Sequence, residues 1–248
     1  MRRSVTSTFL NTLLIIVIVL IPSLVVGLEP LEQECIILAV DTLICFYWFI
    51  TLNSAGAFRK EQQEPHWKHL LILSPVFIVV LSIPITLAID PFARYLVFLG
   101  TDSISIFLNV LKIVVIALIE EMVFRLYFYK MIRKENRLLK IVISAGIYAL
   151  FDLLYLFRGA GLAATAINMG VSFLLGLILG ALMEYGHCIY VCMVYHLLYS
   201  FVGSMESLVA VTSIYFVVQG ILFFIALVYL VVAYFVYFRK KEYDYYVQ

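Results

Sequence analysis

The sequence predicts an all-α protein, a polytopic transmembrane helical bundle of about eight spans with both termini in the cytoplasm. The composition is the first observation: 65% of the residues are hydrophobic and the mean hydropathy is +1.07, whereas soluble domains are about 45–50% apolar. The spacing of the apolar runs and the distribution of Lys and Arg are the other two. We therefore expect one membrane-embedded domain over residues 1–248, with the lipid bilayer as its first partner.

Eight apolar runs approach the length of about 20 residues that crosses a bilayer core of about 30 Å. They lie at residues 8–27, 35–52, 70–89, 104–124, 141–157, 163–183, 188–205 and 208–238. The first run is longer than the apolar stretch of a secretory signal, and no small-residue cleavage site is clear. We expect it to be retained as a span.

Basic residues set the expected orientation. With the N-terminus inside, the outer loops hold only Arg94 and Arg158, and the remaining bases outside the spans fall on the inner side. Because cytoplasmic segments of membrane proteins are enriched in Lys and Arg, we expect both termini inside and a multi-pass plasma membrane protein. The net charge of +1 favours no nucleic acid partner.

Small residues recur every four positions in the sixth run, at Ser172, Gly176 and Gly180. This spacing places them on one helix face, where a neighbouring helix can approach closely. We interpret the face as a packing surface and not as a chemical site.

A small set of ionisable residues falls inside the spans: Asp41, Lys112, Glu120, Glu121, Arg125, Asp152 and His196. Charged groups at such depth are costly and usually face the interior of a bundle. Counting along three spans places Glu120, Asp152 and His196 in one layer, about 12 to 18 Å below the cytoplasmic face. Polar groups that converge from separate helices predict a buried site.

The adjacent glutamates are expected to have different roles. Glu121 and Arg125 are four residues apart, so they share a helix face and can form an ion pair. Glu120 points about 100° away, where it either acts as a general base on water or belongs to a structural polar cluster. His196 and Ser200 share a face of the seventh span. They could donate to an oxyanion, or His196 could ligate a metal or be a satisfied core residue.

The segment Glu120-Glu121-Met122-Val123-Phe124-Arg125 resembles the EExxxR motif of the CAAX-protease and bacteriocin-processing (CPBP, or Abi) family of intramembrane endopeptidases. The later stretch LGLILGALMEYGHCIYVCMVYHLLYSF resembles that family's small-residue helix, turn and HxxxN helix. The resemblance covers a core of residues 104–205. It implies that Glu120 is the water-activating base and that Glu121 and Arg125 are the second acid and its arginine.

Two family positions differ. The FxxxH motif aligns with Tyr148 and Asp152, and the HxxxN motif aligns with His196 and Ser200. An aspartate beside Glu120 would repel it or share a proton with it, and it cannot donate a hydrogen bond when ionised. Ser200 keeps a hydroxyl donor but lacks the reach of an amide.

These residues predict a CPBP/CAAX-type intramembrane endopeptidase that acts on a membrane-associated peptide near the cytoplasmic face. Glu120 would activate water, Asp152 would orient it, and His196 with Ser200 would stabilise the oxyanion. If a divalent metal such as zinc is used, Glu120, Asp152 and His196 are its candidate ligands.

Two alternatives remain open. The first is a catalytically impaired family member that binds another membrane protein, as in bacteriocin self-immunity or the regulation of a membrane sensor kinase or cell-wall enzyme. The second is a transporter with Asp41, Lys112 and Asp152 along its path, although no inverted repeat is evident.

Overall fold

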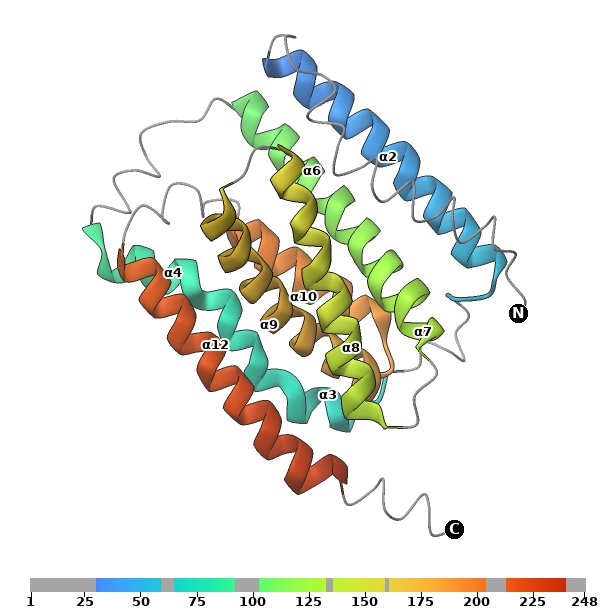
Figure 1. The fold of residues 1–248 in the computed structure, drawn as a ribbon, viewed down its shortest axis with the longest axis vertical. Helices are drawn as coiled ribbons and strands as arrows, with labels where there is room; N and C mark the ends of the chain where they lie inside the picture. Colours follow the sequence, from blue (N-terminus) through green and yellow to red (C-terminus); the bar gives the residue numbers. More distant parts are fainter. Residues whose placement is uncertain are drawn as a thin grey trace.

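The computed structural model describes residues 30–58, 65–91, 103–132, 136–158, 161–203 and 213–239, and every regular element among them is helical (Figure 1). The predicted all-α class is confirmed for this part of the chain. In order, the elements are α2 (Pro30–Ser54), α3 (Trp67–Leu73), η2 (Ser74–Leu81), α4 (Ser82–Ile89), α6 (Ser103–Glu120), η3 (Glu121–Phe128), α7 (Tyr129–Met131), α8 (Arg137–Leu150), η4 (Phe151–Arg158), α9 (Leu162–Gly186), α10 (Ile189–Gly203), α12 (Ser213–Ala233) and η5 (Tyr234–Phe238).

Within the described residues, 4 helical stretches are long and apolar enough to cross a membrane: Leu31–Ser54, Trp67–Ile89, Leu162–Gly186 and Ser213–Phe238. They correspond to the second, third, sixth and eighth predicted runs. The described parts of the runs at 104–124, 141–157 and 188–205 are also helical or nearly so, but they do not reach that combination of length and apolar composition. The run at 8–27 lies outside the described residues. A membrane-embedded helical protein is confirmed, whereas the count of eight and the orientation stay predictions.

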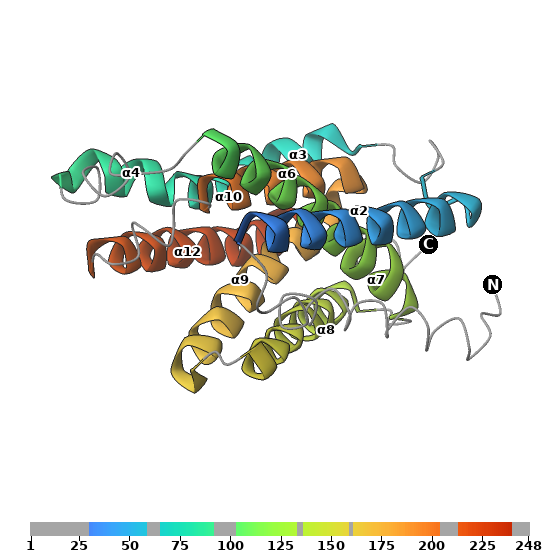
Figure 2. The ribbon, with the colours of Figure 1, turned by 90° about the horizontal axis from the view of Figure 1, so that it is seen from above.

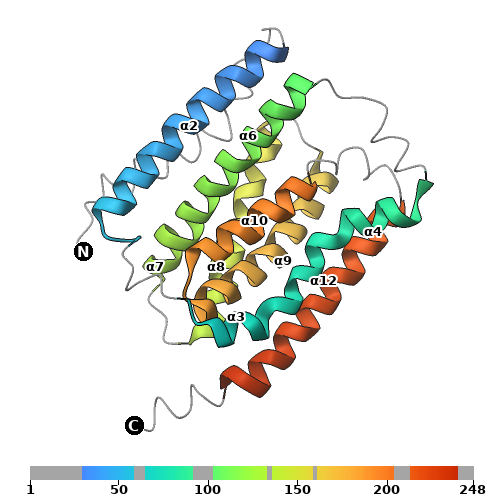
Figure 3. The ribbon, with the colours of Figure 1, turned by 180° about the vertical axis from the view of Figure 1, so that it is seen from behind.

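Helix α10 contacts α6, α9 and η2 and leaves one face exposed, at Tyr190, Val194 and Leu198. Figure 3 shows it between the outer helices α2 and α12. Helix α2 packs on α6, and α12 packs on η2 and α4. Figure 2 shows α8 and α9 as a pair on one side of the other helices. The third predicted span is not a uniform α-helix: η2 is a 3-10 segment with Pro75 in its first turn, because proline cannot donate the backbone hydrogen bond of an α-helix.

Glycines hold α8 and α9 in close contact. A Cβ atom at Gly176 would lie 2.9 Å from the Cα of Ala145, and one at Gly180 would lie 3.0 Å from the Cγ2 of Ile141. Only a residue without a side chain allows the backbones to approach this closely. The predicted packing face is confirmed at both glycines. Ser172, its third member, lines a cavity instead.

A packed core fills one half of the bundle. Many of its members come from the C-terminal parts of α2 and α9, from η3, and from the N-terminal half of α10 and the start of the α3–η2 stretch, and α8 and α12 add others. They include Trp48, Leu73, Val76, Tyr127, Leu182, Cys192 and Tyr195. Trp48 meets Tyr127 edge-on with ring centroids 5.1 Å apart. The Tyr195 hydroxyl donates to the Val76 carbonyl at 3.1 Å. This half of the bundle is therefore closely packed.

The end of the bundle next to this core is fastened by Glu184 on α9. Its carboxylate accepts a hydrogen bond from the Tyr129 hydroxyl, and it pairs with Lys140 Nζ at 3.1 Å and with Arg137 Nε at 3.6 Å. Helix α9 then ends at His187, whose φ of 54° is left-handed. The His66 backbone N–H donates to the Gly186 carbonyl at 3.0 Å. These bonds connect α7, α8, α9 and the start of α3.

Candidate active site

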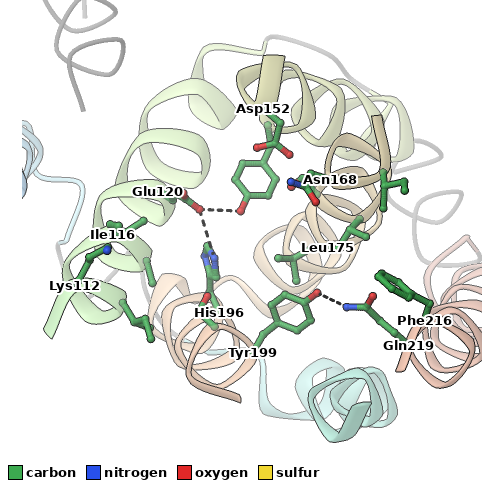
Figure 4. Close-up of a pocket in the computed structure, with 17 residues that line it drawn as sticks. Lys112, Ile116, Glu120, Asp152, Asn168, Leu175, His196, Tyr199, Phe216 and Gln219 are labelled. Atoms are coloured by element: carbon green, nitrogen blue, oxygen red, sulfur yellow. Dashed lines mark hydrogen bonds and ion pairs between the residues drawn. The ribbon is translucent and has the colours of Figure 1, made fainter. Parts of the chain in front are cut away.

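Glu120, the last residue of α6, is where three helices meet. Its carboxylate accepts a hydrogen bond of 2.8 Å from the Tyr148 hydroxyl on α8 and lies 3.5 Å from His196 Nε2 on α10 (Figure 4). The Glu120 side chain is 28% exposed. Glu120 thus faces the other polar helices, as the sequence predicted.

Behind Glu120 lies a fully buried ionic group on η3, a π-helical segment of a kind that often occurs at functional sites. Arg125 Nε lies 3.7 Å from the Glu121 carboxylate, and both side chains are at most 1% exposed. Arg125 Nη1 also donates to Ser144 Oγ at 3.3 Å. His196 Nδ1 lies 2.8 Å from Glu121. The predicted ion pair is therefore present, and Glu121 also orients His196.

Glu120 and His196 face each other beside this ionic group, with 3.5 Å between the Glu120 carboxylate and His196 Nε2. Carboxylate and imidazole groups are the side chains that most often act as general acids and bases. The pair is therefore the candidate for acid–base chemistry at this site.

A cavity of about 380 Å³ begins at Glu120. Residues of α6, α8, η4, α9, α10 and α12 line it, and Figure 4 shows them around its circumference. The polar lining residues beyond the glutamate and histidine are Lys112, Tyr148, Asp152, Asn168, Ser172, Tyr199, Ser200 and Gln219. Gln219 Nε2 donates to the Tyr199 hydroxyl at 3.1 Å. The cavity can thus hold water and a polar chain against Glu120.

Asp152 lies in this cavity, on η4, but Glu120 receives its hydrogen bond from Tyr148, one helical turn earlier. Asp152 hydrogen-bonds with Ser172 instead. Its Oδ2 atom is buried and has no hydrogen-bond partner in the described part of the chain. An oxygen placed in this way can accept a hydrogen bond from water. The sequence analysis assigned no role to Tyr148. Its hydroxyl group, at the aromatic position of the FxxxH motif, was the signal that could have identified it.

The remaining predicted residues divide between the cavity and its surroundings. Ser200 and Lys112 line the cavity, whereas Asp41, buried on α2, is not among its lining residues. Sequence reasoning also missed Asn168 and Ser172, which are four residues apart on α9, and the glutamine at 219. The 168/172 spacing could have identified the first two as one polar face.

The predicted metal ligands do not form a metal site here. Among the described residues, no three His, Cys, Asp or Glu side chains are grouped so that they could hold a metal ion. Both ring nitrogens of His196 face glutamates. The donor set fits proton transfer better than ligation of zinc, which takes at least three protein ligands.

A comparison with known protein families supports this resemblance. Residues 102–202 match the family model described as Type II CAAX prenyl endopeptidase Rce1-like. No curated protein and no solved structure matches the chain. The matched residues include Glu120, Glu121, Arg125 and His196. The predicted resemblance to the CPBP family is confirmed over this segment, since residues 102–202 are similar to the Rce1-like group of CAAX-type proteases.

Proposed function

We propose that this chain is an intramembrane peptidase that hydrolyses a membrane-associated peptide, with Glu120 as the base that activates water. The observation that supports it most is the position of Glu120. It lies at the inner end of the cavity, accepts a hydrogen bond from Tyr148 and faces His196. Among the described side chains, no Lys or Arg forms an ion pair with it. Its carboxylate is therefore free to accept and return a proton.

The proposed reaction uses the chain's own residues. Water attacks the peptide carbonyl carbon while Glu120 takes one of its protons. His196 donates to the oxyanion that develops on the carbonyl oxygen, and Glu121 holds the imidazole in place through its 2.8 Å contact. The carbon–nitrogen bond then breaks, and Glu120 returns the proton to the leaving amine. The products are a carboxylate and an amine.

Asp152 and Ser200 complete the proposal. Asp152 Oδ2 accepts a hydrogen bond from the attacking water, and the Ser200 hydroxyl is a second donor to the oxyanion. Tyr148, at the aromatic position of the motif, donates to Glu120, while Asp152 stands at the histidine position. We place the protein in the plasma membrane with both termini in the cytoplasm, because the basic residues of the sequence are distributed in that way.

The test compares two carboxylate-to-amide substitutions, Glu120→Gln and Glu184→Gln. Cells that express each variant at equal levels are analysed by mass spectrometry for the new peptide termini in their membrane fraction. We expect Glu120→Gln to abolish the termini that depend on this chain and Glu184→Gln to preserve them, because Glu184 lies in the packed end of the bundle and not in the cavity.

Unchanged termini with Glu120→Gln would refute the peptidase proposal. If that variant also kept the phenotype that the chain confers on its host, the result would favour a protein that acts by binding.

A further inference from the structure

One end of the bundle is basic. Four of the described Lys and Arg residues lie where α3 and α8 begin or η5 ends: Lys68, Arg137, Lys140 and Arg239. Figure 1 shows the start of α8 and the end of α12 at the same end of the molecule. Among the described residues, the acidic side chain there is Glu184, which pairs with Arg137 and Lys140. This basic end therefore carries more positive than negative charge.

An apolar groove lies next to the basic end, where α8, α9 and α12 meet. Its volume is about 190 Å³, and side chains of α3, α8, α9, α12 and η5 line it. The floor of the groove is buried and includes Leu73, Ile141, Ala181 and Phe238. The residues on its two sides are exposed: Leu138 and Val142 on α8, and Val231 and Phe235 on α12 and η5. The groove therefore extends from the core to the surface of the described part of the chain.

The lining of the groove determines what can fill it. All of the lining side chains are aliphatic or aromatic, and none is charged. Water finds few hydrogen-bond partners in such a space, so apolar cavities stay dry. An empty groove would lose the van der Waals contacts that close packing provides. Because lipid acyl chains surround the bundle in a bilayer, hydrocarbon is the material that fills the groove.

Two of the basic residues lie directly beside the lining. Arg239 follows Phe238 in the sequence, and its guanidinium carbon lies 5.4 Å from the ring centroid of Phe235. Arg137 precedes Leu138 on the α8 side of the groove. Among the described side chains, Arg239 forms no ion pair with a carboxylate. The two arginines can thus donate hydrogen bonds to an anion at the basic end of the groove.

The segment η5 indicates that this end lies at the level of the lipid head groups. Four of its five residues are aromatic: Tyr234, Phe235, Tyr237 and Phe238. Tyrosine and other aromatic residues gather where the hydrocarbon of a bilayer meets water. Arg239 follows them directly, at the depth of the lipid phosphates. Basic pockets between membrane helices are sites where the head groups of anionic lipids bind.

We infer that this groove binds an anionic phospholipid. An acyl chain of the lipid lies on the floor of the groove, and Arg137 and Arg239 hold its head group. The hydrocarbon lining alone would accept any lipid, whereas the two arginines select a negatively charged one. The inference does not depend on the proposed peptidase function, because none of the residues that line the groove lines the cavity at Glu120.

The charge selection is tested on the purified full-length chain, freed of lipid in detergent. The chain is titrated with phosphatidylglycerol or with phosphatidylcholine that carries the same acyl chains, and native mass spectrometry measures the affinity of the first lipid bound. We expect phosphatidylglycerol to bind more tightly than phosphatidylcholine. Arg239→Gln should weaken phosphatidylglycerol binding about fivefold and leave phosphatidylcholine unaffected. Lys68→Gln removes the same charge from the same end, away from the groove, and should change neither affinity.

The position of the lipid is tested with two neighbouring substitutions on α12. Val231→Trp places a large ring in the groove, whereas Val232→Trp is its control, because Val232 is exposed to a similar extent (51% against 55%) and does not line the groove. We expect Val231→Trp to lower the affinity for both lipids and Val232→Trp to preserve it. Melting curves without lipid verify that each variant is folded.

Three results would overturn the inference. Equal affinity of the parent chain for the two lipids would exclude selection by charge. Equal loss of binding in the two tryptophan variants would place the lipid elsewhere. A dimer that Val231→Trp alone prevents would show that a second copy of the chain occupies the groove. Should Val231→Trp fail to fold, the comparison of Arg239→Gln with Lys68→Gln decides by itself.

Discussion

Glu120 and Glu184 are two carboxylates in one bundle, and each accepts a hydrogen bond from a tyrosine. Glu184 receives it from Tyr129 and is also paired with Lys140 and Arg137, two permanent cations, at the packed end. Glu120 receives it from Tyr148 and faces only the titratable His196, beside a cavity. The same donor type therefore serves two environments. A carboxylate paired with fixed cations fastens helices, whereas one that faces a histidine beside a cavity is placed for acid–base chemistry.

The largest expected difference comes from removing one cation from each region. Arg125→Met leaves Glu121 buried and uncompensated, which should lower the free energy of unfolding by about 3–5 kcal/mol. Lys140→Met should lower it by less than about 1 kcal/mol, because Lys140 is partly exposed and Arg137 still pairs with Glu184. Denaturant titration in detergent micelles measures both. The double variant Glu121→Gln/Arg125→Met should recover part of the loss, and equal losses for the two single variants would contradict the comparison.

Removing the tyrosine hydroxyls tests the comparison through activity. A hydrogen bond to a charged group contributes about 1.5–3 kcal/mol, so Tyr148→Phe should slow peptide hydrolysis about 10- to 100-fold. Tyr129→Phe should leave the rate unchanged, because the Tyr129 hydroxyl contacts Glu184 and not the cavity. The rate of product formation at equal protein levels is the measurement. A similar slowing in both variants would mean that Tyr148 acts only through the stability of the bundle.

The interface between α8 and α9 connects the two regions. It includes the Lys140–Glu184 contact, and the η4 segment that extends α8 adds the Asp152–Ser172 contact. Gly176→Ala would place a Cβ atom 2.9 Å from the Ala145 Cα and should cost about 1–3 kcal/mol of stability. Gly170→Ala is the matched control on α9, because nothing lies within 4 Å of its Cβ position. It should be neutral or slightly stabilising in thermal unfolding. A loss of equal size at Gly170 would show that the close approach at Gly176 is not the cause.

The smallest expected effect is a pH dependence at the basic end. Partial burial, and then the neighbouring His66, lower the pKa of His187 below its usual value of 6.5. The unfolded chain therefore binds a proton more readily than the folded one, so stability is fully present above about pH 6.5 and is lost as the pH falls below it. The melting temperature should fall less between pH 7.5 and 5.5 in His187→Gln than in the parent chain. An unchanged slope would exclude His187 as the source.

Spacing within one helix predicted part of this site correctly. The Glu121–Arg125 pair and the direction of Glu120 follow from the angles between neighbouring residues on a helix, which the sequence alone determines. The contacts between helices could not be predicted from the sequence in the same way. Asp152 and Glu120 were expected in one layer, but the residue that contacts the glutamate is Tyr148, one helical turn before Asp152.

The Glu184 cluster was not predicted at all. Its partners lie 44 and 55 residues away in the sequence, so that no local pattern connects them. The small-residue face was predicted from spacing and is present, yet Ser172 at its end lines the cavity because α8 gives way to η4 at that level. Packing between elements decides such roles, and this packing depends on every side chain in the interface.

The packed core between Glu120 and the basic end also affects the electrical properties of the membrane. A hydrated cavity with carboxylates and an imidazole would conduct protons if it continued through the bundle, and each charge that crosses gains about 2.3 kcal/mol per 100 mV of membrane potential. Trp48, Tyr127, Leu182 and Tyr195 fill that path with side chains that are at most 1% exposed. A chain with a polar cavity in its interior can in this way keep the membrane insulating.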